Sequence, residues 1–309
     1  MSQRVWDPDP VAFVLPLLGR QVRWYGIIFA LAFLFGFILY RRQVLRGGGT
    51  EDEAVSFIIP GFLGTVLGAR LGHVLFYNFE HFLNDPLWFF KIWDGGLASH
   101  GAAAGLALAL LYQSRRTRRP FLWLSDRFAF SAALGAALVR LGNFMNSEIV
   151  GKIAPENSPF AVYFPLHDAP PVPPRYPTQL LESFSGFLIL GALFLGDRLW
   201  GREKRPRGAL SALFLVLYFA LRFLAEFFKE RQGPFDDFLL SRGQLLSILP
   251  LALGALLLVR VLRRKRVDDG SPRESSFFFK PASGKKRDKA PAAGAAKAPR
   301  RSGKRPRKR

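Results

Sequence analysis

The stretch FAFSAALGAALVRLGNFMNSE, residues 128–148, begins as an apolar run typical of a membrane helix and ends in polar groups. Within nine residues it carries Arg140, Asn143, Asn146 and Glu148. Lipid offers such groups no hydrogen-bond partners, and a charge near the bilayer centre costs about 2.5–3.5 kcal/mol on insertion scales. The stretch therefore indicates a polar site near one end of a membrane helix.

The distribution of charge divides the chain into two parts. Of its 309 residues 50% are hydrophobic, yet the net charge is +21. Residues 263–309 carry 18 Lys and Arg against 4 Asp and Glu, and they are rich in Ala, Pro, Gly and Ser. A segment of this composition cannot bury a core. We therefore predict a membrane domain at residues 1–262 and a disordered basic tail at residues 263–309.

Seven apolar stretches precede the tail, each long enough to cross about 30 Å of hydrocarbon. They predict an all-α polytopic membrane protein with spans at residues 24–40, 55–78, 87–112, 121–145, 179–199, 209–228 and 244–262. Clusters of Lys and Arg occur in every second linker, at residues 41–46, 115–119 and 202–207 and in the tail. By the positive-inside rule, the N-terminus should lie outside and the C-terminus in the cytoplasm.

Several classes of site are absent from the sequence. Cysteine does not occur, so there is no disulfide, thiolate metal site or cysteine nucleophile. The four histidines lack the spacing of metal ligands, and no glycine-rich nucleotide-binding loop occurs. We therefore expect no metal, no cofactor and no nucleotide-driven pump.

On the predicted topology, four spans bring polar groups toward the outer face. These groups include Tyr25, His100, Arg140, Arg222 and Glu226. Structural roles are also open to them, since Arg140 can reach the interface and Glu226 can neutralise Arg222 one turn away. Two arginines facing one cavity nevertheless favour an anionic phosphate, which a guanidinium group binds through two parallel hydrogen bonds.

The second span carries two patterns of its own. Gly61, Gly64 and Gly68 recur at the spacing of small residues that lets two membrane helices approach closely. Arg70 and His73 lie one turn apart. The sequence leaves open whether these two residues line a pocket or bond a neighbouring helix.

The segment VRLGNFMNSEIVG, residues 139–151, closely resembles the signature of the bacterial phosphatidylglycerol–prolipoprotein diacylglyceryl transferases, G-R-x-G-N-F-hydrophobic-N-x-E-x-x-G. All the fixed positions match except the first, where Val139 replaces glycine. Other family motifs occur in order: WYG (24–26), GGLASHG (95–101), RYPTQLLE (175–182), LRFLAEFF (221–228) and GQLLS (243–247). The resemblance covers residues 20–262 and leaves out the tail.

The chain also departs from the family pattern. Arg23 stands where histidine is usual before WYG, and Ala102 follows His100-Gly101 where a second glycine is common. After LRFLAEFF the usual Arg-x-Pro-Asp is replaced by KERQGPFDD, so we give Lys229 and Asp236 less weight. None of these changes touches the arginine, asparagine and glutamate positions of the signature.

The resemblance implies an enzyme of the bacterial cytoplasmic (inner) membrane. It would transfer the sn-1,2-diacylglyceryl group of phosphatidylglycerol to the lipobox cysteine of a preprolipoprotein, forming a thioether and releasing glycerol-1-phosphate. Its partners would be phosphatidylglycerol, the lipobox segment and membrane lipids, with no specific nucleic acid. No cofactor is implied.

The resemblance also implies roles for individual residues. Arg140 and Arg222 are expected to stabilise the charge of the phosphate leaving group. His100 is expected to accept the thiol proton, because an unperturbed histidine has a pKa of about 6.5, and Tyr25 is the rival for this role. Glu148 is expected to orient Arg140 or Asn146. The residues expected to bind phosphatidylglycerol are Arg140, Asn143, Asn146, Glu148, Gly151, Arg222 and Glu226, with Tyr25 assisting.

Two other classes of function stay open at this stage. An anionic-lipid transporter or flippase would also present arginines to the outer leaflet, but such proteins usually show internal repeats, and we find no duplicated segment. A membrane scaffold whose tail binds nucleic acid or anionic lipid would leave the intramembrane arginines unused.

Overall fold

The computed structural model describes residues 4–16, 19–91, 95–230 and 240–264. The chain divides into two units, Met1–Pro272 and Arg273–Arg309, and the described residues all belong to the first. Asp236 and the predicted tail, apart from Arg263 and Arg264, lie outside the described residues. The disorder of the tail therefore stays a prediction.

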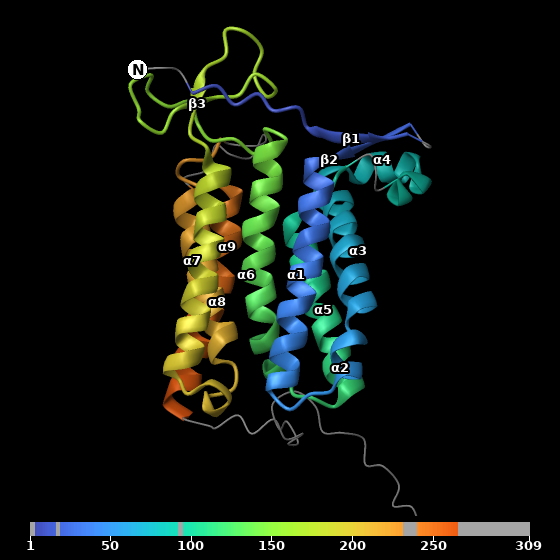
Figure 1. Cartoon of the computed structure of the whole chain (residues 1–309), viewed down its shortest axis with the longest axis vertical. Coiled ribbons are helices and arrows are strands. Elements are labelled where there is room, and N and C mark those ends of the chain that lie inside the picture. Colours follow the sequence, from blue (N-terminus) through green and yellow to red (C-terminus); the bar gives the residue numbers. More distant parts are fainter. Residues whose placement is uncertain (1–3, 17–18, 92–94, 231–239, 265–309) are drawn as a thin grey trace, which may run out of the picture. The chain divides into compact units, whose positions relative to one another are not determined.

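Long helices dominate the described residues and fall on the seven predicted apolar stretches (Figure 1). They are α1 (Trp24–Arg46), α3 (Ile58–Tyr77), α5 (Ser99–Thr117), α6 (Phe121–Met145), α7 (Thr178–Leu199), α8 (Ala209–Ala225) and α9 (Arg242–Arg264).

Five helical segments of the described chain are long and apolar enough to cross a membrane: Trp24–Arg46, Glu51–Tyr77, Phe121–Met145, Thr178–Leu199 and Arg242–Arg263. The apolar helix α8 is shorter. Large apolar side chains point outward along these helices, including Ile59, Leu195 and Leu256, which are 70%, 58% and 68% exposed. Soluble proteins rarely expose so much contiguous apolar surface. The chain is therefore a helical membrane protein.

The boundaries predicted for the third span, residues 87–112, are wrong. The 3-10 helix η1 (Pro86–Phe90) follows the short helix α4 (Phe79–Asn84), and α5 begins only at Ser99. Gly95 and Gly96 have φ angles of 83° and 70°, in the left-handed region that favours glycine. These glycines interrupt the apolar pattern of the sequence, but apolar composition alone does not show where the helix begins.

Arg70 is buried and fixes this loop by donating hydrogen bonds to its backbone. Nη1 donates to the carbonyl of Gly95 at 2.7 Å, Nη2 to Trp88 at 2.5 Å, and Nε to Phe89 at 2.9 Å. The guanidinium also stacks over the Trp88 ring at 4.0 Å. Arg70 therefore bonds the backbone of η1 and of Gly95, and these partners do not belong to a neighbouring long helix.

Close packing joins α3 to α5, while α1 packs on α6, α6 on α7 and α8 on α9. A Cβ added to Gly64 would lie 2.6 Å from the carbonyl oxygen of Gly105, and one added to Gly68 would lie 2.5 Å from that of Gly101. The predicted glycine contact is thus confirmed for Gly64 and Gly68. Gly61 instead faces the ring of Phe57.

The two ends of the helical unit differ in their connections (Figure 1). One end, here called the loop end, carries the antiparallel pairs β1 (Val11–Leu15) with β2 (Arg20–Arg23) and β3 (Val162–Tyr163) with β4 (Pro174–Arg175). The other, here called the basic end, carries α2 (Glu51–Val55), η3 (Arg202–Lys204) and the predicted basic clusters at residues 41–46, 115–119 and 202–207.

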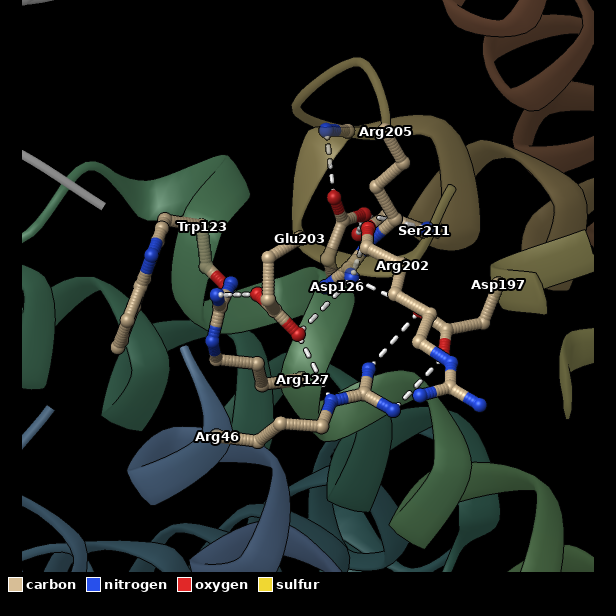
Figure 2. Close-up of polar contacts among 10 residues, drawn as sticks. Arg46, Trp123, Asp126, Arg127, Asp197, Arg202, Glu203, Arg205 and Ser211 are labelled. Atoms are coloured by element: carbon tan, nitrogen blue, oxygen red, sulfur yellow. Dashed lines mark hydrogen bonds and ion pairs between the residues drawn. The ribbon is translucent and has the colours of Figure 1, made fainter. Parts of the chain in front are cut away.

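Three arginines from separate elements converge on two carboxylates at the basic end (Figure 2). Asp197 accepts ion pairs from Arg46 and Arg205, each at 2.8 Å. Glu203 accepts ion pairs from Arg46 and Arg127, each at 2.7 Å. These contacts tie α1, α6 and α7 to the turn before α8, so part of the basic charge serves to hold the helices together.

We predict that Asp197→Asn lowers the stability of the folded unit. The Asp197 and Arg205 side chains are 4% and 0% exposed, and removing one partner of a buried pair typically costs about 3–5 kcal/mol. The thermal unfolding midpoint in detergent should therefore fall clearly below that of wild type. Glu51→Gln, which removes a half-exposed pair with Arg41, is the control and should change the midpoint little. Equal midpoints for the three proteins would contradict this account.

Candidate functional site

A pocket lies at the loop end between α6, α7 and α8. Its lining residues are Ala136, Arg140, Glu182, Ser185, Gly186, Ile189, Tyr218, Leu221 and Arg222. The walls combine apolar side chains with three charged groups. Gly186 allows α7 to approach α6, because a Cβ there would lie 2.8 Å from Ala137. Apolar walls that carry a few charged side chains are the usual composition of a ligand-binding site.

Glu182 contacts three cations, of which Arg140 and Arg222 line the pocket with it. Its Oε2 lies 3.0 Å from Nε of Arg140, and its Oε1 lies 3.2 Å from Nζ of Lys229 and 3.8 Å from Nη1 of Arg222. The Glu182 side chain is only 8% exposed. Sequence reasoning gave Glu182 no role and gave Lys229 less weight. The only signal for Glu182 was its place in the RYPTQLLE motif.

Glu226 forms a second branch of the cluster. Its Oε1 lies 3.7 Å from Nη2 of Arg222 and 3.4 Å from Nζ of Lys229. Its Oε2 accepts a hydrogen bond from the hydroxyl of Ser241 at 3.1 Å. Gly243 leaves room for this contact, because a Cβ there would lie 2.2 Å from the carboxyl carbon of Glu226. Glu226 therefore does pair with Arg222, as its spacing suggested, but it shares that pairing with Lys229.

The backbone beside Gly151 sets the position of Lys229. Gly151 pairs with Lys229 in an antiparallel bridge, and the amide of Lys152 donates to the carbonyl of Phe228 at 2.8 Å. A Cβ on Gly151 would lie 2.4 Å from the Tyr176 carbonyl oxygen. The structure thus places Gly151 in backbone packing beside the site, whereas the lining of the pocket is formed by other residues.

The charge of Lys229 is set by opposing influences. Burial lowers the pKa of the Lys229 ammonium, and the nearby Arg140 and Arg222 charges lower it as well, while Glu182 and Glu226 act in the opposite direction. Glu182 and Glu226 therefore offset part of the effect of burial on the pKa of Lys229.

The signature residues form a chain of hydrogen bonds. Arg140 donates from Nη1 to Oδ1 of Asn143 at 3.2 Å, and Asn143 donates from Nδ2 to Oε2 of Glu148 at 3.2 Å. Asn146 donates to the other oxygen of Glu148 at 3.0 Å. Glu148 therefore contacts Asn146 directly, which is one of the two alternatives expected for it. Its link to Arg140 in the described contacts runs through Asn143.

Tyr25 and the N-terminal segment pack against the same motif. A Cβ on Gly142 would lie 2.9 Å from Cδ2 of Tyr25, so the motif glycine makes room for this ring. Trp6 stacks on Phe144 at 4.3 Å and donates from Nε1 to its carbonyl oxygen at 2.9 Å. The structure therefore brings Tyr25 to the signature and adds Trp6, which the sequence did not suggest.

Arg175 forms hydrogen bonds within the loop between α6 and α7, beside the site. It donates to both carboxylate oxygens of Asp168 at 2.6 and 2.7 Å, and to the Gly151 carbonyl at 3.1 Å. Its Nη1 also lies 3.0 Å from Oε1 of Glu230. These hydrogen bonds hold the pKa of Asp168 below its usual value. Arg175 therefore fixes both backbone segments that position Lys229.

His100 lies in the first turn of α5, in aromatic surroundings. Its ring is 5.0 Å from that of Phe76 and 6.0 Å from that of Tyr77. Its Nε2 is buried and has no hydrogen-bond partner within the described ranges. The positive charge of Arg222 acts electrostatically on the His100 ring.

Neither His100 nor His73 is among the residues that line the pocket between α6, α7 and α8. The Nε2 of His73 is 2.9 Å from Nδ2 of Asn78, within the same stretch of chain, and its ring stacks on Tyr77 at 5.6 Å. His73, like Arg70, therefore contacts residues at the loop end of the helical unit.

Comparison with known proteins identifies the family to which the chain belongs. The family model for prolipoprotein diacylglyceryl transferase matches residues 10–260. The phosphatidylglycerol–prolipoprotein diacylglyceryl transferase of Photobacterium profundum is 40% identical over 257 residues, covering 81% of this chain and 92% of the relative. The enzyme of the same name from Escherichia coli O1:K1 is 37% identical over 279 residues, covering 83% and 94%. The chain therefore belongs to the prolipoprotein diacylglyceryl transferase family.

Proposed function

We propose that this transferase moves the sn-1,2-diacylglyceryl group of phosphatidylglycerol onto the lipobox cysteine of a preprolipoprotein. The observation that carries the proposal is the convergence of Arg140, Arg222 and Lys229 on Glu182, which lines an apolar-walled pocket together with the two arginines. The printed names of the relatives, which pair phosphatidylglycerol with prolipoprotein, support the same substrates.

The reaction exchanges one bond for another. The cysteine sulfur attacks the sn-3 carbon of the diacylglyceryl group, and the bond between that carbon and the phosphate oxygen breaks. Glycerol-1-phosphate leaves with the electron pair, while the thiol proton passes to a base. Negative charge therefore grows on the phosphate, where fixed cations lower the barrier most. Arg140 and Arg222 are assigned this role.

The amides of the signature are assigned to the head group. Asn143 and Asn146 each donate one hydrogen bond to Glu148, which fixes the direction of both side chains. Donors held in this way bind glycerol hydroxyls and phosphate oxygens without first losing side-chain freedom. Tyr25, packed against the motif, would complete this part of the site.

His100 is assigned as the base. Its buried Nε2 without a partner in the described part of the chain is available to accept a proton, and a neutral imidazole is suited to proton transfer near neutrality. Tyr25 is the rival candidate.

The proposed topology puts this chemistry at the outer face of the bacterial inner membrane. All seven long helices would span, with the N-terminus outside and the C-terminus and tail in the cytoplasm. The grouping of the basic clusters at the end opposite the pocket supports this orientation.

The direct test is to incubate purified protein in phosphatidylglycerol liposomes with a lipobox peptide and to examine the peptide by mass spectrometry. A gain of one diacylglyceryl group in thioether linkage is expected, and a peptide with serine in place of the cysteine should gain nothing. Redistribution of lipid between leaflets without any adduct would indicate a flippase instead.

We predict that Arg140→Lys and Arg222→Lys each reduce kcat/KM at least about 100-fold, the usual effect of losing one donor to a developing negative charge. An ammonium group cannot reproduce the paired donors of a guanidinium group. Transfer would be measured after confirming equal insertion of both variants in the membrane. Normal turnover by well-inserted variants would remove phosphate stabilisation from the mechanism.

We predict that His100→Gln impairs transfer by about 100-fold or more near pH 7. The loss should shrink toward pH 9, because a free thiol with a pKa of about 8.5 ionises there unaided. Tyr25→Phe, measured over the same pH range, serves as the comparison. A loss that is equal at every pH would assign His100 to positioning, and pH rescue of Tyr25→Phe alone would make Tyr25 the base.

A further inference from the structure

The cations around Glu182 outnumber the carboxylates that contact them. Arg140, Arg222 and Lys229 each lie within 3.8 Å of Glu182 or Glu226. In the described contacts, these three cations are therefore paired with two carboxylates. Among the described residues in direct contact, the cluster therefore has one positive charge in excess; Glu148 is linked to Arg140 through Asn143 and does not contact these cations directly. A phosphodiester carries one negative charge and would balance it.

Glu182 already presents to these cations what a phosphate group would present. Its two oxygens contact different cations, Oε2 facing Arg140 and Oε1 facing Lys229 and Arg222. Carboxylate and phosphate offer the same kind of acceptor to a guanidinium group. Glu182 also lines the pocket itself, so a ligand phosphate and the Glu182 carboxylate would compete for the same donors.

Building on the proposed function, we propose that Glu182 is a resident counter-ion that gives way to the phosphate of an anionic glycerophospholipid and returns when the phosphate monoester leaves. Without Glu182, the three cations would repel one another in a site of low dielectric, and an anionic ligand would relieve this repulsion. The carboxylate keeps them ordered before lipid binds.

The same competition weakens the binding of the product. Glycerol-1-phosphate carries more negative charge than the diester from which it comes, so an unopposed cluster of cations would retain it. A carboxylate that competes for Arg140, Arg222 and Lys229 lowers the affinity for ground-state phosphate while leaving the pocket formed. Glu182 is thus a positioning residue that acts through the cations.

The test compares the binding of glycerol-1-phosphate to detergent-solubilised wild type, Glu182→Gln and Glu51→Gln by titration calorimetry. Glu182→Gln keeps the side-chain shape but removes the competing charge. We expect its affinity for glycerol-1-phosphate to rise about tenfold or more, a change of one decade in Kd. In the transfer assay the same variant should show stronger product inhibition and a lower kcat. Glu51→Gln removes an exposed carboxylate of α2 and should bind as wild type does.

The expected direction separates this role from simple damage, because a misfolded site would bind the product more weakly. Glu182→Asp withdraws the carboxylate by one methylene and should also tighten binding, to a smaller degree, which keeps the test valid should the glutamine variant not fold. Unchanged or weaker binding by a folded variant would overturn the proposal. Failure of wild type to modify the lipobox peptide would instead count against the proposed function, since binding is measured without transfer.

Discussion

Arg140 of α6 and Arg222 of α8 both face Glu182 of α7, and this meeting of charges governs much of the structure. A charged group surrounded by lipid is strongly unfavourable, so helices that carry charges are stable only if those charges contact one another or a polar cavity. The ion pairs with Glu182 therefore determine which faces of the three helices meet. The pocket forms where they meet, and its charge follows from the same residues.

Both ends of the helical unit contain clusters of ion pairs, but the two clusters differ in how closely their charges are paired. At the basic end, Asp197 and Glu203 each bind two arginines in short contacts, and these join α1, α6 and α7. At the loop end three cations again meet two carboxylates, but the contacts of Arg222 are longer, at 3.7 and 3.8 Å, and part of this cluster lines a pocket. A tightly paired network stabilises the fold, whereas an incompletely paired one can bind an anionic ligand.

The sequence predicted the helices well because apolar length is a local property. The predicted boundaries of α6, residues 121–145, agree with the structure, and the close contact of Gly64 and Gly68 with α5 was expected from spacing alone. The start of α5 at Ser99 was not predicted, although the glycines at residues 95 and 96 interrupt the apolar pattern just before it. The predicted topology across the membrane and the tail stay predictions.

Only part of the candidate site was predicted, because only some of its contacts join residues that are close in sequence. Arg140, Asn143, Asn146 and Glu148 lie close together in the chain, so their contact was predictable from a single motif. Glu182 and Lys229 meet across 47 positions of sequence, and this pairing depends on how Arg175 and Gly151 place the backbone. Long-range contacts of this kind follow from tertiary packing and have no local pattern.

The central claim is that Arg140 and Arg222 act on one phosphate group as a unit. A double-mutant cycle in kcat/KM for diacylglyceryl transfer, comparing wild type, Arg140→Lys, Arg222→Lys and the double variant, tests it most directly. Residues that act together show strongly non-additive losses. We expect the kcat/KM of the double variant to be about equal to that of the less active single variant. Losses that multiply would mean that the two arginines act independently, and would contradict the account.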